Sequence, residues 1–81
     1  MGQVPISVTI EHKFDSNPPA GWLPQGRIQF SAFSGQTIGR LLSSINEFRS
    51  PQHTITQLYN ISGNMIQPAT ILPKRNVTYY I

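Results

Sequence analysis

The side chains that could carry out acid–base chemistry are few. The chain has two histidines, His12 and His53, and three acidic residues. Acid–base catalysis needs two titratable groups held close together in a pocket. Glu11 and His12 are neighbours in an alternating segment, so a strand would point them to opposite faces. His53 follows Pro51 in a predicted loop, where we expect it to be solvated. These positions predict a protein without enzymatic activity.

Motifs for nucleophilic catalysis and phosphate binding are missing from the sequence. The serines do not form the Gly-x-Ser-x-Gly turn that presents a nucleophile in many hydrolases. Gly35 and Gly39 are not followed by the Lys-Ser/Thr pair that completes a phosphate-binding loop. Gly39 instead falls inside a predicted helix, where it indicates either close packing against a neighbour or a tolerated weak helix former. With no cysteine in the chain, we expect neither a metal site nor another cofactor.

Charge and aromatic residues are compatible with an acidic partner. Six Lys and Arg residues against three acids give a formal net charge of +3. This charge is mild, since nucleic-acid-binding domains usually carry a denser basic cluster. The strongest basic feature is the adjacent pair Lys74 and Arg75. Phe33, Tyr59 and Tyr80 are candidate exposed rings on which bases could stack, so nucleic-acid binding stays open as an alternative.

Composition predicts one folded domain over residues 1–81. Hydrophobic residues make up 38% and charged residues only 11% of the chain, which is unlike a disordered segment. No apolar run approaches the roughly 20 residues that span a bilayer, and the N-terminus lacks a signal-peptide pattern. The motif for myristoylation of Gly2 requires Ser or Thr where Ile6 stands. Lack of cysteines suits a reducing compartment, so we expect an intracellular, cytoplasmic protein.

The N-terminal part predicts a hairpin with a long connection. Segment 6–14 alternates apolar and polar residues and places His12 on the apolar side, a pattern typical of a half-buried strand. Segment 27–33 alternates in the same way. Residues 15–26 are rich in Pro, Gly and Asn and predict a loop. We expect Trp22 in this loop either to fold back on the core or to contact a partner.

The middle of the chain predicts a single helix. Apolar residues recur at intervals of three and four from Ile38 to Phe48, which places them in one stripe. Thr37 suits the N-cap position, and Ser50 before Pro51 suits the helix end. We expect this stripe to form the core with side chains of the strands: Ile38, Leu41, Leu42, Ile45 and Phe48 against Val8, Ile10, Ile28, Phe30, Leu58 and Tyr79.

The C-terminal part predicts further strands. Segment 54–59 is rich in β-branched and aromatic residues, a turn leads to a short strand at 65–66, and segment 77–81 alternates. A lone helix has one apolar stripe to bury, so we expect an α+β fold in which a mixed sheet of four to five strands packs on the helix. The last strand should lie beside the first, in parallel. This is the β-grasp plan.

Two stretches resemble known families. Residues 35–38, Gly-Gln-Thr-Ile, resemble the helix entry of ubiquitin-like domains. The run 55–66, with an apolar-x-x-Leu-Tyr strand and a turn ending in Gly, is similar to the C-terminal half of a doublecortin-type domain, as is the Tyr-containing segment 77–81. The resemblance covers residues 35–81. The loop 15–26 departs from it, because it lacks that family's basic and Asn-Gly-Asp elements.

The resemblance implies a ubiquitin-like β-grasp fold and a role in binding other proteins. Ubiquitin-like modifiers are conjugated through a flexible tail ending in glycines, whereas this sequence ends on Tyr80-Ile81 in a predicted strand. We therefore do not expect conjugation. Doublecortin domains bind acidic tubulin through basic loops, and here Lys74, Arg75 and scattered arginines would have to serve. Binding to tubulin or microtubules is an alternative on this ground.

We therefore expect a non-enzymatic protein–protein interaction domain, an adaptor or scaffold, that binds a macromolecular partner through the sheet face away from the helix. The alternatives are doublecortin-like tubulin binding and a role as a small nucleic-acid-binding or viral accessory protein. A competing site is an edge strand with the Trp22 loop, which would also permit self-association by main-chain pairing. The predicted partner-binding residues are Thr9, Gln29, Tyr59, Tyr80, Trp22, Lys74 and Arg75.

Overall fold

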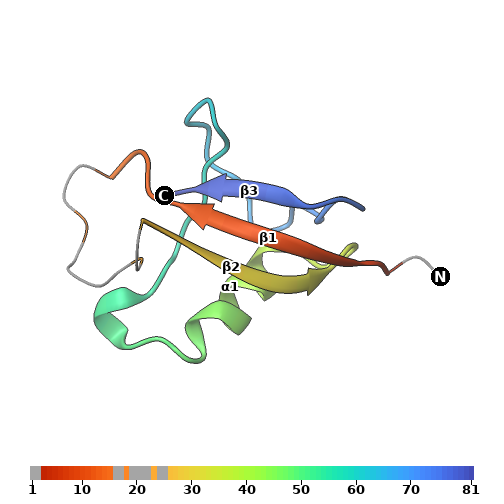
Figure 1. The fold of residues 1–81 in the computed structure, drawn as a ribbon, viewed down its shortest axis with the longest axis horizontal. Helices are drawn as coiled ribbons and strands as arrows, with labels where there is room; N and C mark the ends of the chain where they lie inside the picture. Colours follow the sequence, from red (N-terminus) through yellow and green to blue (C-terminus); the bar gives the residue numbers. More distant parts are fainter. Residues whose placement is uncertain (1–2, 16–17, 19–22, 24–25) are drawn as a thin grey trace.

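The computed structural model describes residues 3–15, 18, 23 and 26–81 and contains one α-helix and a three-stranded mixed sheet over these residues (Figure 1). In chain order the elements are strand β1 (Pro5–Glu11), strand β2 (Arg27–Phe33), helix α1 (Ile38–Asn46), the short 3-10 helix η2 (Pro51–His53) and strand β3 (Val77–Tyr80).

The sheet has the strand order β2-β1-β3, with β1 in the centre. β1 pairs antiparallel with β2, so that Val8 lies opposite Phe30. It pairs in parallel with β3, so that Val8 also lies beside Val77. The predicted hairpin and the parallel pairing of the first and last strands are therefore confirmed. Because side chains alternate along a strand, even-numbered residues of β1 and β2 face inward and odd-numbered ones outward.

Helix α1 begins at a capped N-terminus that is tied to the loop 68–70. The Thr37 side chain accepts a hydrogen bond from the Arg40 N–H at 3.2 Å, which confirms the predicted N-cap. The first two N–H groups of the helix also have acceptors: those of Ile38 and Gly39 donate to the carbonyls of Thr70 and Pro68 at 2.9 and 3.0 Å. A Cβ atom on Gly39 would lie 3.5 Å from Pro68, an ordinary van der Waals contact, so packing does not require glycine at this position and a tolerated weak helix former explains it.

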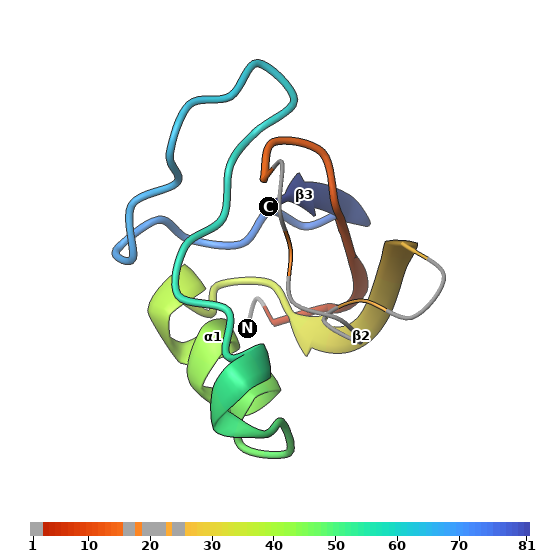
Figure 2. The same cartoon turned by 90° about the vertical axis from the view of Figure 1, so that its left-hand side faces the viewer.

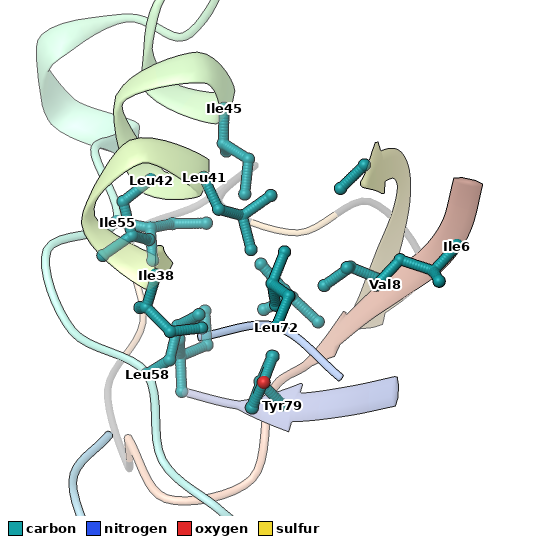
Figure 3. Close-up of a cluster of buried hydrophobic side chains, with 13 residues drawn as sticks. Ile6, Val8, Ile38, Leu41, Leu42, Ile45, Ile55, Leu58, Leu72 and Tyr79 are labelled. Carbon is teal, nitrogen blue, oxygen red and sulfur yellow. The ribbon is translucent and has the colours of Figure 1, made fainter. Parts of the chain in front are cut away.

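The hydrophobic core lies between α1 and the inner face of the sheet (Figure 2). Side chains of the helix and of the strands point toward one another there (Figure 3). Ile28 and Phe30 of β2 are partly buried and pack against this core at its margin. The fully or nearly buried members are Ile6, Val8, Ile10, Ala32, Ile38, Leu41, Leu42, Ile45, Ile55, Leu58, Leu72, Tyr79 and Ile81.

The prediction of a β-grasp sheet of four to five strands is wrong, because the described residues form three strands. Segment 54–59 runs alongside the sheet but contributes only single bridges at Tyr59, to Tyr80 and to Met65. Its Ile55 backbone is bonded to the Asn46 side chain instead of a strand. The predicted short strand at 65–66 is limited to the bridge at Met65, and Ile71 makes one further bridge, to Thr37.

Phe48 and His12, which the sequence patterns place on the apolar side, lie outside the core. The helix ends at Asn46. After it, the Arg49 N–H donates to the Asn46 carbonyl at 3.2 Å, a bond between residues three apart that is typical of a 3-10 turn at a helix end. Phe48 follows this end and is 89% exposed, so its place in the core stripe was wrongly predicted. β1 ends at Glu11, and His12 beyond it is exposed and not on the apolar face.

Candidate partner-binding site

The outer face of the sheet carries polar side chains along its centre. Thr9 in β1 lies opposite Gln29 in β2 and beside Thr78 in β3. Gln29 is exposed and Thr9 half-buried. Two of the predicted partner-binding residues, Thr9 and Gln29, are therefore direct cross-strand neighbours on the face away from α1.

Tyr59 and Tyr80 meet at one end of this face. They form an antiparallel bridge in which each N–H donates to the other's carbonyl at 2.8 Å. Directly bridged residues place their side chains on the same face, and Tyr80 is paired with the outward residue Glu11 of β1. The Tyr59 hydroxyl donates to the Gln57 side-chain carbonyl at 2.8 Å, which fixes its ring further. The side chains of the two predicted tyrosines are therefore neighbours on the outer face of the sheet.

Phe14 and Lys13 complete a cluster with these tyrosines. The Phe14 ring centroid is 5.9 Å from that of Tyr59 and 6.3 Å from that of Tyr80, both in edge-to-face geometry. The Lys13 ammonium lies 5.7 Å from the centroids of both Phe14 and Tyr80, within the range of a cation–π interaction. We call these four residues, Lys13, Phe14, Tyr59 and Tyr80, the aromatic–lysine site.

The chain segment after β1 turns so that Lys13 and Phe14 reach the tyrosines. The N–H groups of Lys13 and Phe14 both donate to the Ile81 carbonyl, at 2.7 and 2.8 Å. The Ile81 N–H in turn donates to the Glu11 carbonyl at 2.9 Å. These bonds close the segment against the end of β3, next to Tyr80. The site is therefore built on backbone contacts between residues far apart in the sequence.

The turn 60–64 supports the ring of Phe14 from the other side. The Asn60 side chain accepts hydrogen bonds from the N–H groups of Ser62 and Asn64, at 2.9 and 3.0 Å. Gly63 adopts a φ of 89°, a conformation that favours glycine. A Cβ atom there would lie 3.4 Å from Phe14, so the absence of a side chain allows the turn to pack closely on the ring.

A pocket of about 280 Å³ adjoins the aromatic rings. Phe14, Tyr59 and Ile81 form the apolar part of its wall, and Asp15, Thr56 and Gln57 form the polar part. Phe14 is 40% exposed, so its ring is accessible to a partner. The arrangement places an apolar surface, hydrogen-bonding groups and charged side chains of both signs close together, which suits recognition of a partner's side chain.

The remaining predicted site residues do not join this cluster. Lys74 and Arg75 are exposed in the bend before β3. Since β3 runs parallel to β1 and Tyr80 stands at its far end, they lie at the opposite end of the sheet. The basic pair on which tubulin binding depended is thus apart from the aromatic rings. Trp22 lies outside the described residues.

Lys13 and Phe14 are the site residues that the sequence did not indicate. Period-two alternation extended the first strand through residue 14 and assigned Phe14 to the core face. The Lys-Phe pair at the strand end, followed by the turn formers of 15–26, was the only sequence pattern that pointed to these residues. That pattern does not indicate which distant segment the Phe14 ring contacts.

The two histidines each contact a group in their own segment. The His12 ring bonds to the Asp15 carbonyl, and the His53 ring lies 3.1 Å from the Ser50 hydroxyl. Within the described ranges, no three His, Asp or Glu side chains gather closely enough to hold a metal ion. In the same part of the chain no helix has the length and apolar character needed to cross a membrane.

Comparison of the chain with family models, curated proteins and solved structures finds no significant match. The class of molecule is defined here by the fold and site alone: a small α+β domain with one helix on a three-stranded mixed sheet.

Proposed function

We propose that this domain is a non-enzymatic protein-interaction module that binds a partner through the aromatic–lysine site at the end of its outer sheet face. The observation that carries the proposal is the clustering of Tyr59 and Tyr80 around the Phe14 ring, with the Lys13 ammonium 5.7 Å from the Phe14 and Tyr80 centroids and a pocket of about 280 Å³ beside the rings.

Aromatic side chains suit this role because they bring a large contact area at low entropic cost. Tyr in particular is enriched where interfaces have their strongest contacts. The rings here are held by edge-to-face contacts and by the Tyr59–Tyr80 bridge, so little rigidity has to be gained on binding. The site is prearranged for a partner.

The chemistry of the site favours a partner segment with an apolar side chain next to a carboxylate. The apolar group would enter the pocket against Phe14 and Tyr59. The carboxylate would approach the Lys13 ammonium, which lies on the neighbouring rings. The domain's net charge of +3 favours encounter with such an acidic segment.

Single-stranded nucleic acid is the second candidate, because exposed rings beside a cation also stack bases. The exposed Phe14 ring with Lys13 is the observation in its favour. Against it, Lys74 and Arg75 lie at the other end of the sheet and do not extend a basic track from the rings.

A selection experiment separates the two candidates. Peptides displayed as a random library are selected on the domain, and the bound peptides are mapped by amide chemical shifts. We expect peptides that combine an aromatic or aliphatic residue with Asp or Glu, and shifts concentrated at Lys13, Phe14, Tyr59 and Tyr80. An oligothymidine probe is tested in parallel at two salt concentrations. Tight, strongly salt-dependent oligothymidine binding at these residues, with no peptide selected, would replace the proposal by the nucleic-acid function.

A further inference from the structure

Strand β2 forms one edge of the sheet, and β1 is its only strand partner in the described part of the chain. The Ser34 N–H donates to the Val4 carbonyl at 2.9 Å, and the His12 N–H donates to the Gly26 carbonyl at 3.1 Å. Bonded pairs alternate along an antiparallel ladder, so the even-numbered residues of β2 bond to β1. The main-chain groups that face away from the sheet are those of Arg27, Gln29, Ser31 and Phe33.

The outward main-chain groups of Phe33 already have a hydrogen-bond partner within the chain. The Phe33 N–H donates to the Gln36 side-chain carbonyl at 3.4 Å, and the Phe33 carbonyl accepts from the Gln36 N–H at 3.3 Å. Gln36 therefore caps the edge at this end. The edge that can receive another strand consists of residues 27–31, with its outward-facing main-chain groups at Arg27, Gln29 and Ser31.

We propose that this edge pairs with the same edge of a second copy of the chain, antiparallel and centred on Gln29. In this register Gln29 lies opposite its own counterpart, and Arg27 of each protomer lies opposite Ser31 of its partner. Each of these three pairs exchanges two main-chain hydrogen bonds. The result is one continuous sheet across two protomers.

A second copy is the occupant because the strand is self-complementary about Gln29. A two-fold axis there places Ile28 of each protomer opposite Phe30 of its partner. The same axis places each Arg27 opposite an uncharged serine, which keeps the two guanidinium groups at opposite ends of the interface. The two Arg27 side chains therefore do not repel each other across the paired strands.

Burial supports the same pairing. Ile28 and Phe30 point inward but are only partly buried, since they lie at the margin of the core. In the proposed register Ile28 of one protomer lies opposite Phe30 of its partner, so each covers apolar surface of the other. β2 contains no Pro, and its one charged residue, Arg27, stands at the end of the strand and not at the central position Gln29.

The first test compares two substitutions at the central position. Gln29→Pro removes the outward N–H that pairing uses, while Gln29→Ala keeps it and removes only the side chain. We expect sedimentation equilibrium to show a reversible dimer for the unmodified chain and for Gln29→Ala. Gln29→Pro should weaken the dimer by roughly tenfold to a hundredfold, from the loss of the central main-chain bonds. A chain that stays monomeric at millimolar concentration overturns the proposal, and so does a folded Gln29→Pro variant that dimerises normally.

The second test reads the register and does not require Gln29→Pro to fold. The chain has no cysteine of its own, so any disulfide between two protomers must join the introduced cysteines. Bonded antiparallel partners have Cα atoms about 5.5 Å apart, within reach of a disulfide. Gln29→Cys should therefore form a covalent dimer under mild oxidation. Ser31→Cys should not, because its counterpart lies four residues along, about 13 Å away. Equal cross-linking of both variants, or preferential cross-linking of Ser31→Cys, overturns the proposed pairing.

Discussion

The side-chain amide of Asn46, the last residue of α1, forms two hydrogen bonds with the backbone of Ile55. It donates to the Ile55 carbonyl at 2.7 Å and accepts from the Ile55 N–H at 2.9 Å. Ile55 is fully buried in the core. The helix end thus provides the hydrogen bonds that a neighbouring strand would otherwise give to this segment.

Replacing Asn46 by Ala should destabilise the domain by about 2 kcal/mol, because both partly buried backbone groups of Ile55 lose their partner. Urea unfolding measures the change, with Asn64→Ala in the exposed turn as the control. Asn46→Asp should also destabilise, since a carboxylate accepts from the N–H but cannot donate to the carbonyl. Equal stability of Asn46→Ala and Asn64→Ala would show that the two hydrogen bonds between the Asn46 amide and the Ile55 backbone contribute nothing to stability.

Leu42 and Phe48 should differ sharply in their contribution to stability. Leu42 is 9% exposed and belongs to the core, whereas Phe48 is 89% exposed. Leu42→Ala should cost about 2–4 kcal/mol through lost burial and the cavity left behind. Phe48→Ala should change the free energy of unfolding by less than about 0.5 kcal/mol. Thermal and urea unfolding of both variants check this, and a large loss for Phe48→Ala would place its ring in the core after all.

Alanine at two glycines should have opposite effects. A Cβ atom on Gly39 would make ordinary contact with Pro68, and Ala is the better helix former, so Gly39→Ala should stabilise the domain by up to about 1 kcal/mol. Gly63 has a φ of 89° and lies against Phe14. Gly63→Ala should destabilise by about 1 kcal/mol and shift the Phe14 ring resonances. Unchanged ring resonances in that variant would contradict the close packing of turn 60–64 on Phe14.

Tyr79 should make stability fall at high pH. Burial raises the pKa of its phenol above the ordinary value of 10.0, while the positive charge of Arg75 acts in the opposite direction and only partly offsets this. The folded state therefore holds the proton after the unfolded chain has lost it. The stabilisation is fully present below about pH 10 and is lost as pH rises through the folded pKa.

Unfolding of the unmodified chain and of Tyr79→Phe, followed from pH 8 to pH 11 (about one unit either side of the ordinary tyrosine range), measures this effect. The stability difference between the two should be constant at the lower values and should shift in favour of Tyr79→Phe at the highest. Parallel pH profiles throughout would contradict a raised pKa for Tyr79.

The sequence was sufficient for elements whose pattern is local. Alternation in 27–33 predicted β2 with its observed bounds, and Thr37 predicted the start of α1. It was insufficient for segment 54–59, whose β-branched residues suit a strand but whose Ile55 backbone is bonded by the Asn46 amide. Sequence patterns describe propensity, and a hydrogen bond supplied by a distant side chain overrides it.

Half of the aromatic–lysine site could be predicted for a similar reason. Both tyrosines were expected on the outer face, Tyr80 from the alternation of 77–81 and Tyr59 from the β-branched and aromatic residues of 54–59. Phe14 and Lys13 reach them only because the backbone after Glu11 turns onto the Ile81 carbonyl. That turn depends on a contact between the two ends of the described fold, and no local pattern specifies it.

The most direct test of the proposed function is the affinity of a library-selected peptide for two matched variants. Tyr59→Ser removes a ring of the aromatic–lysine site, and Ile71→Ser removes a side chain that is 54% exposed and lies elsewhere, at the bridge to Thr37. With folding checked by circular dichroism, calorimetry should show at least about tenfold weaker binding for Tyr59→Ser, the loss of one strong interface contact. Ile71→Ser should bind as the unmodified chain does. Equal affinity of a folded Tyr59→Ser variant and the unmodified chain would contradict a partner site at this end of the sheet.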